Sequence, residues 1–191
     1  MKQQEWVLTR KKLLRKIKAQ VFDRLGEPPA SLRQYAKRLT DEFRGRWRAC
    51  EWNELLKSVA ESDVTFGSDF HAHAQSQRAH VRILRELPTD RPVVLALECI
   101  CLEDNESVDQ YLNGEISEEK FLDEVEWTYV WGFPWGNYRP LFLLARERGF
   151  LIRGLSRRDD SKKALCLEVR DERMASDVAD FQMEQPHSLI Y

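Results

Sequence analysis

The chain has 191 residues, of which 42% are hydrophobic and 32% are charged, and its formal net charge is −2. A chain of this length can bury a sizeable core as one globular domain, with room for an accessory helical segment. No uninterrupted apolar run approaches the roughly 20 residues that a membrane-spanning helix needs, which excludes a transmembrane protein. The N-terminus carries no readable export signal, so we expect a cytoplasmic protein.

The small net charge conceals a strong asymmetry along the chain. Residues 1–50 hold 14 Lys and Arg against 5 Asp and Glu, whereas residues 51–191 hold 16 against 27. A basic segment beside an acidic body is compatible with a nucleic-acid partner, an acidic membrane surface, or packing of one part on the other. The basic residues interleave with Leu13, Leu14 and Ile17 as on the solvated face of an amphipathic helix. We therefore favour packing and predict no nucleic-acid partner.

The first sixty residues predict helices without an intervening strand. Apolar residues recur at helical spacing from Trp6 to Leu25, and Gly26 with the following prolines ends this helix. Two further helices are expected over about residues 31–48 and 51–60. We therefore expect a helical extension over residues 1–60, followed by a second domain over residues 61–191.

Short strands alternate with helices in this second domain. Residues 63–67, 93–97 and 150–155 are apolar or β-branched, and residues 188–191 begin a fourth strand. The helices expected around them cover residues 73–87, 105–113, 117–126, 138–148 and 167–183. This alternation predicts βαβ crossovers, and hence an α/β fold with a mostly parallel sheet and helices on both faces.

Polar residues follow two of the predicted strands. Asp69 and His71 come after the first strand, and Glu98 directly follows the apolar run 93–97. Ligands of open α/β sheets bind at the carboxyl ends of the strands, so these side chains converge on one rim if the two strands are neighbours. Such a set can bind a divalent metal ion for hydrolysis, with His71 and Glu98 catalytic, or can act as a general acid–base set without metal. A His71 that only organises its turn is the simpler alternative.

The other histidines give weaker indications. His73 and His80 are seven residues apart, close to two helical turns, and are expected to be ordinary surface or boundary residues. His187 precedes the last strand and has no evident partner.

The sequence also lacks a glycine-rich nucleotide motif and a G-x-S-x-G elbow, so it does not support nucleotide binding or a serine hydrolase.

A dense aromatic segment covers residues 127–140. It holds three Trp, two Tyr and one Phe, interrupted by two Gly and two Pro, which excludes one long regular helix. Such a segment either fills a core, which we favour, or forms the wall of an apolar pocket. A flat ligand such as a porphyrin suits a wall of this kind, with a Tyr or His available for iron. Under that alternative, the cofactor-binding candidates are Trp131, Trp135, Tyr138 and Arg139.

An ordered series of short motifs runs from residue 66 to residue 146. It comprises Phe66-Gly-Ser-Asp-Phe-His71, Gln75-Ser-Gln-Arg78 leading into Ile83-Leu84, Leu95-Ala-Leu-Glu98, Val108-Asp-Gln-Tyr-Leu-Asn-Gly114-Glu-Ile-Ser117, Trp131 to Trp135, Tyr138-Arg-Pro-Leu141 and Ala145-Arg146. The series resembles the ChaN-like proteins of the haem-binding-uptake, Tiki-type superfamily. The similarity spans about residues 60–184 and lies in the order of the motifs.

The resemblance implies an α/β fold with a strand-end Gly-x-x-His signature, a strand-end Glu, and haem binding linked to iron acquisition. More distant relatives imply metal-dependent hydrolysis instead. Asp69 and His71 fall on the signature, Glu98 on the acidic strand end, and Tyr138 on the aromatic-Arg-Pro segment. This chain departs from the pattern at Ser68, where the signature has Gly. The family also continues beyond a strand such as 188–191 into a second Gly-Asp-x-His signature, so we expect a truncated or atypical C-terminus.

Three functional hypotheses follow. The leading one is a haem- or iron-associated binding protein whose ligand is haem or another small molecule. The second is a metal-dependent hydrolase that holds a divalent ion on Asp69, His71 and Glu98. The third is a non-catalytic interaction module that uses the basic helices. A homodimer stays open under each hypothesis.

Overall fold

The chain folds as two units, over residues 1–49 and 50–191. The computed structural model describes residues 2–42, 50–88, 90–158 and 167–191. None of the helices in these ranges combines the length and the apolarity that crossing a bilayer requires.

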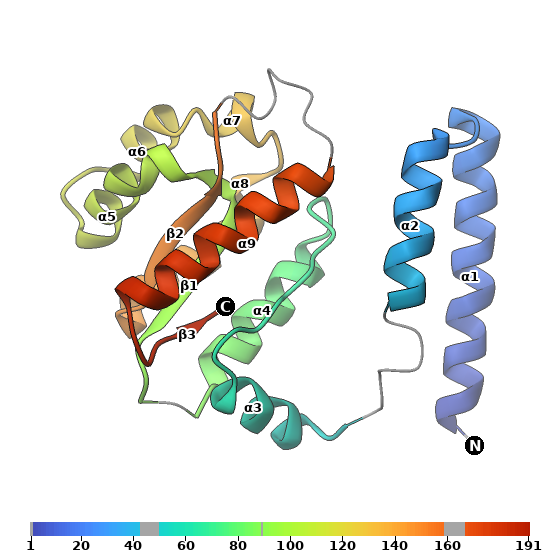
Figure 1. Ribbon diagram of the computed structural model, residues 1–191, viewed down its shortest axis with the longest axis horizontal. Coiled ribbons are helices and arrows are strands. Elements are labelled where there is room, and N and C mark those ends of the chain that lie inside the picture. Colours follow the sequence, from blue (N-terminus) through green and yellow to red (C-terminus); the bar gives the residue numbers. More distant parts are fainter. Residues whose placement is uncertain (1, 43–49, 89, 159–166) are drawn as a thin grey trace. The chain divides into compact units, whose positions relative to one another are not determined.

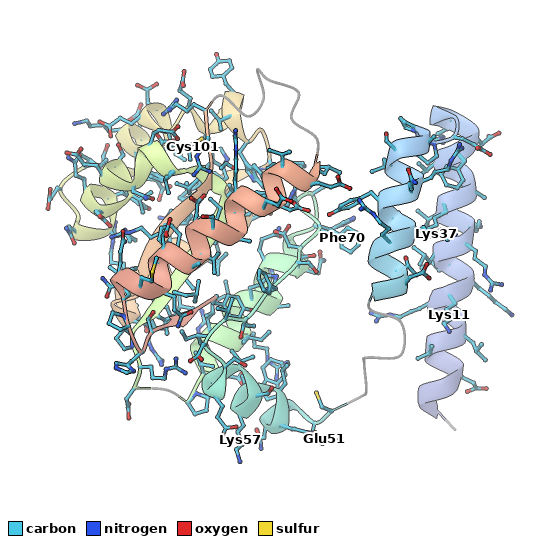
Figure 2. All side chains as sticks on the ribbon, in the orientation of Figure 1. Lys11, Lys37, Glu51, Lys57, Phe70 and Cys101 are labelled. Carbon is cyan, nitrogen blue, oxygen red and sulfur yellow. The ribbon has the colours of Figure 1, made fainter. Side chains whose placement is uncertain are left out.

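The N-terminal unit contains helix α1 (Lys2–Leu25) and helix α2 (Ala30–Glu42), and its described residues include no strand. Helix α1 ends as predicted at Gly26, which adopts a left-handed conformation with φ +76°. Apolar side chains such as Leu13, Leu14 and Ile17 are exposed along α1. Basic side chains such as Lys11 on α1 and Lys37 on α2 project from the same unit (Figure 2). The helix predicted to run to residue 48 is described only to Glu42, and its remainder lies outside the described residues.

The second unit is built on a parallel sheet of three strands in the order β2-β1-β3. The central strand β1 (Val93–Cys101) pairs with β2 (Leu151–Ser156) on one side and with the short β3 (Leu189–Ile190) on the other (Figure 1). The strand predicted at residues 63–67 is wrong, because this segment contributes only one isolated bridge, from Val64 to Ile190. Among the described residues its pairing partner is the two-residue strand β3, which is too short for the ladder to extend.

The pairing of β1 with β2 becomes irregular where β1 reaches the predicted site. The register runs evenly from Val94 to Leu97 and resumes only at Cys101, opposite Ser156. Between these points, the hydroxyl of Ser156 donates to the Glu98 carbonyl oxygen at 2.6 Å. A glycine is needed at position 154, because a Cβ atom there would lie 2.5 Å from the Cys101 carbonyl. This close approach lets β1 continue four residues beyond the predicted end of the strand.

Helices cover both faces of the sheet, as the sequence predicted. Val93, Leu95 and Ile152 face the larger core, together with side chains from α3 (Trp52–Glu61), α4 (Ala74–Glu86), α5 (Asn105–Asn113), α6 (Glu118–Glu124) and α8 (Trp135–Arg148). Val94 and Ile190 face the opposite side, where they pack against Val178 and Phe181 of α9 (Leu167–Glu184). Figure 1 shows α9 lying across this second face. The alternation of side chains along β1 thus gives each face its own core.

Local signals fix the shorter elements. A 3-10 turn, η1 (Leu102–Asp104), links β1 to α5. Ser117 caps α6 as predicted, because its hydroxyl accepts the backbone N–H of Lys120 at 3.2 Å. The aromatic segment forms the short helix α7 (Trp127–Val130), then turns at Gly132 with φ +75°, and continues into α8. The predicted interruption of a long helix is therefore confirmed.

Candidate functional site

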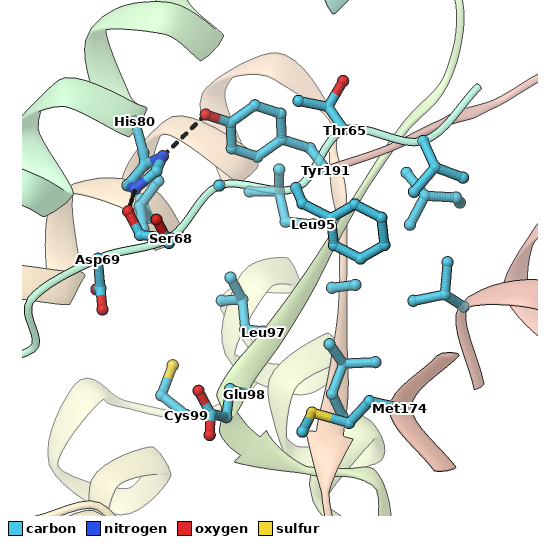
Figure 3. Close-up of a pocket in the computed structure, with 18 of the residues that line it drawn as sticks. Thr65, Ser68, Asp69, His80, Leu95, Leu97, Glu98, Cys99, Met174 and Tyr191 are labelled. Carbon is cyan, nitrogen blue, oxygen red and sulfur yellow. Dashed lines mark hydrogen bonds between the residues drawn. The ribbon is translucent and has the colours of Figure 1, made fainter. Parts of the chain in front are cut away.

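A pocket of about 550 Å³, called here the β1 pocket, lies along the middle of β1, from Leu95 to Cys99. Its walls come from the segment 64–71, from β1, from α8 and from α9. Glu98 and Cys99 lie at one end of the cavity and Thr65 and Tyr191 at the other (Figure 3). Most of the lining is apolar, so the few polar side chains determine its chemistry.

Asp69 and His71 form a hydrogen-bonded pair at this pocket. The His71 Nδ1 atom contacts Asp69 Oδ1, and the second carboxylate oxygen accepts from Gln77 Nε2 at 2.5 Å and from the Tyr138 hydroxyl at 3.3 Å. An ionised carboxylate can only accept hydrogen bonds, so Nδ1 of His71 donates to Asp69 and carries the one ring proton of the uncharged imidazole. The lone pair of His71 is therefore on Nε2.

Glu98 lies on the other side of the imidazole. Its Oε2 atom is 4.0 Å from His71 Nε2, which is too long for a hydrogen bond, and its Oε1 atom is 3.0 Å from Arg170 Nη1. The guanidinium of Arg170 on α9 compensates the Glu98 charge. The structure thus brings Asp69, His71 and Glu98 together at one pocket.

The aromatic segment serves both as core and as pocket wall. Trp131 and Phe133 pack on His71, with ring centroids 4.4 Å and 5.1 Å from that of the imidazole. Trp131 and Tyr138 line the β1 pocket. Trp135 instead packs in the core against Tyr111, Phe121, Trp127 and Phe142.

Two of the predicted cofactor-binding residues therefore do not line this pocket. Trp135 is a core residue, and the Nε atom of Arg139 donates to Glu118 Oε2 at 2.6 Å. The Tyr111 hydroxyl donates to the same carboxylate oxygen. The spacing of these residues in the sequence does not distinguish them from Trp131 and Tyr138. The chain turns at Gly132, so one part of the aromatic segment contacts the pocket and another part contacts the core.

Burial sets the protonation of two further side chains that line the pocket. It raises the pKa of Tyr138 well above the usual range for a phenol, and the neighbouring Asp69 charge adds to the increase. Burial likewise raises the pKa of the Cys99 thiol. At neutral pH both groups keep their protons, so Tyr138 serves as a donor to Asp69.

The candidate residues do not make up a standard metal centre. Within the described ranges, no three His, Cys, Asp or Glu side chains are grouped so that they could hold an ion. The geometry around Asp69 agrees with this finding, because its oxygens already receive donors from His71, Gln77 and Tyr138.

Three further residues of this site were not identified from the sequence. Gln77 binds Asp69, Arg170 binds Glu98, and His80 lines the β1 pocket. Gln77 and His80 are three residues apart and share a face of α4, a spacing visible in the sequence. The sequence gives no indication that this face meets residues 68 and 69.

Comparison with known proteins supplies the family. A family model described as haem-binding uptake, Tiki superfamily, ChaN matches residues 55–166. The match contains the segment 64–71, β1, the aromatic segment and β2, and it covers more than half of the chain. No curated protein and no solved structure matched the chain. The chain therefore belongs to the ChaN family of the haem-binding uptake, Tiki superfamily.

Proposed function

We propose that the chain binds haem in the β1 pocket, with His71 as the ligand of the iron. The Asp69–His71 pair carries this proposal, because Nδ1 is held by a carboxylate while Nε2 has no hydrogen-bond partner among the described residues. Metal-ligating histidines donate their second ring N–H to a carboxylate or carbonyl in this way. Haem would supply an iron that an imidazole nitrogen can bind, and Nε2 of His71 would hold it.

The pocket suits a flat and mostly apolar ligand. Leu95, Leu97 and Met174 line it, and the Trp131 ring stands beside the imidazole. Apolar and aromatic walls with a few placed polar groups are typical of cofactor pockets. We assign Tyr138 an indirect role, since its proton is committed to Asp69. The family-level association with haem supports the same ligand class.

A titration of the full chain with haemin, followed by absorbance, tests this function. The wild-type protein should give a saturable Soret shift, and His71→Gly should give a weaker and displaced band that added imidazole restores. His187→Asn is the matched control, because His187 does not line the β1 pocket. An unchanged spectrum in His71→Gly, or no Soret shift in the wild type, would refute the proposal.

A second candidate function uses the same side chains. Glu98 Oε2 lies 4.0 Å from His71 Nε2, a separation that lets one water or ion lie between them. The metal-dependent hydrolase stays a prediction for Asp69, His71 and Glu98, and it requires Asp69 to give up one of the donors that it accepts in this structure. Elemental analysis of the purified protein distinguishes it from haem binding. About one zinc or manganese per chain, lost in Glu98→Ala, would favour the hydrolase.

The cytoplasmic location also stays a prediction, to be checked by cell fractionation.

A further inference from the structure

The segment that carries Asp69 and His71 has little secondary structure of its own. Residues 65–70 belong to no helix or strand. Side chains on such a segment are placed by tertiary contacts rather than by a backbone ladder. The contacts that place this segment come largely from helix α4.

His80 on α4 holds the segment at Ser68. Its Nε2 atom is 3.2 Å from the Ser68 carbonyl oxygen, and its Nδ1 atom is 2.8 Å from the Tyr191 hydroxyl (Figure 3). A carbonyl oxygen can only accept, so Nε2 carries the proton and Nδ1 accepts from the tyrosine. Burial raises the pKa of Tyr191 to about 12, which keeps this hydroxyl a donor at neutral pH. The imidazole is thus fixed at both nitrogens.

Gln77 holds the next residue from the same helix face. It lies three residues before His80, and its Nε2 atom donates to Asp69 Oδ2 at 2.5 Å. Positions three apart are neighbours on a helix surface. Helix α4 therefore contacts three consecutive residues of the segment: Ser68 through His80, Asp69 through Gln77, and Phe70, whose backbone N–H donates to Ser76 Oγ at 3.2 Å.

Gly67 provides the room that this arrangement needs. A Cβ atom at this position would lie 2.6 Å from Cε1 and 2.8 Å from Nδ1 of His80, and 3.3 Å from the Tyr191 hydroxyl. The φ angle of Gly67 is not positive, so other residue types can also adopt its backbone conformation. Glycine is required because the imidazole passes directly over this residue to reach Ser68.

We infer that His80 is a positioning residue for the Asp69–His71 pair, and that it acts through the Ser68 carbonyl. This inference rests on the proposed function of that pair. If His80 is an ordinary boundary residue, as the sequence predicts, removal of its ring will leave the site unchanged. The positioning role requires that removal of the ring disturbs the hydrogen bond between His71 and Asp69.

The first test observes His71 without any ligand. Nitrogen–proton correlation NMR of the imidazoles in the wild-type protein should show the hydrogen-bonded Nδ1 proton of His71. His80→Ala should weaken or shift this signal, and His80→Gln, which keeps one acceptor and one donor, should restore it. His187→Asn should leave it unchanged.

The second test measures haemin binding by the same proteins. We expect His80→Ala to lower the affinity about tenfold, the effect of losing two neutral hydrogen bonds, and His80→Gln to recover most of this loss. A folded His80→Ala protein with wild-type affinity and a wild-type His71 signal would overturn the inference. If His80→Ala does not fold, Tyr191→Phe is used in both tests instead. It frees Nδ1 of His80 and so loosens the ring that holds Ser68, and a wild-type His71 signal with wild-type affinity in this variant would likewise overturn the inference.

A paired substitution separates positioning from stability. Gly67→Ala should lower the melting temperature, because the methyl group meets the His80 ring. The double variant Gly67→Ala/His80→Ala should recover part of this loss but keep the low haemin affinity. Affinity that recovers together with the melting temperature would show a merely structural role.

The two tests also separate this inference from the proposed function. If the wild-type protein shows no response to haemin, the haem proposal fails, and the ligand-free NMR signal still decides the role of His80. If haemin binds and His80→Ala retains the wild-type signal and affinity, the haem proposal stands and the positioning role is refuted.

Discussion

Replacing Gln77 by glutamate places a second carboxylate against Asp69. Gln77 is 1% exposed, and its Nε2 atom lies 2.5 Å from Asp69 Oδ2, so the introduced oxygen meets a like charge at short range. Two unit charges about 4 Å apart repel by about 4 kcal/mol at the effective dielectric constant of such sites. The protein avoids this repulsion by keeping one proton on the pair.

The cost of keeping that proton can be estimated independently. Holding a glutamic acid protonated at about pH 7, against its usual pKa of about 4.3, costs about 4 kcal/mol. The two estimates agree, so Gln77→Glu should lower the free energy of unfolding by about 4 kcal/mol at neutral pH. The folded state then binds one proton more than the unfolded state. The loss of stability in Gln77→Glu is therefore small at low pH, where both states bind the proton, and it grows as the pH rises.

Urea unfolding followed by circular dichroism measures this effect. Between about pH 7 and pH 5, the stability of Gln77→Glu relative to the wild type should rise by about 1.4 kcal/mol for each pH unit. Gln77→Leu is the matched control, because it removes the same amide without adding a charge, and its difference from the wild type should not follow this slope. A pH-independent difference for Gln77→Glu would refute the close contact between Gln77 and Asp69.

Three further predictions concern the pocket wall, a helix cap and the N-terminal unit. Trp131→Ala should weaken haemin binding because it removes a ring beside His71, whereas Arg139→Met should not, since Arg139 binds Glu118 outside the pocket; absorbance titration compares them. Ser117→Ala should lower the free energy of unfolding by about 1 kcal/mol, as denaturant titration can show, because α6 loses its cap. Deletion of residues 1–49 should leave haemin affinity unchanged, and a salt-sensitive partner lost on this deletion would instead support the interaction module.

The fold class followed from the sequence because hydrophobic patterns report burial directly. The run 93–97 predicted a strand covered on both faces, and β1 has that environment. Its extension to Cys101 was not predictable, because it depends on how closely Gly154 approaches a neighbouring strand. The strand predicted at residues 63–67 failed for the same kind of reason, since a strand also needs a partner of sufficient length.

The candidate site was predicted from the rule that ligands bind at the carboxyl ends of strands. In the structure Glu98 lies on a strand, whereas Asp69 and His71 do not. The rule places Asp69 and His71 beside Glu98 if residues 63–67 and 93–97 form neighbouring strands. The two side chains reach that position on an irregular segment, where Gln77 and Tyr138 hold Asp69. Side chains on helices, such as Gln77 and Arg170, were missed because helical periodicity fixes their face but not the residue that this face meets.

The lining of the β1 pocket comes partly from within the family match and partly from α9, which follows it. Met174 and Val178 line the cavity from α9, beyond residue 166 where the family match ends, whereas Asp69 and His71 lie within the match. The candidate polar residues and part of the apolar wall therefore lie within the match, whereas α9 supplies the rest of the wall and the Arg170 partner of Glu98. Substitutions along α9 can reshape the cavity for ligands of different size while the imidazole and its carboxylate stay in place, which makes this helix the natural region in which to alter ligand preference.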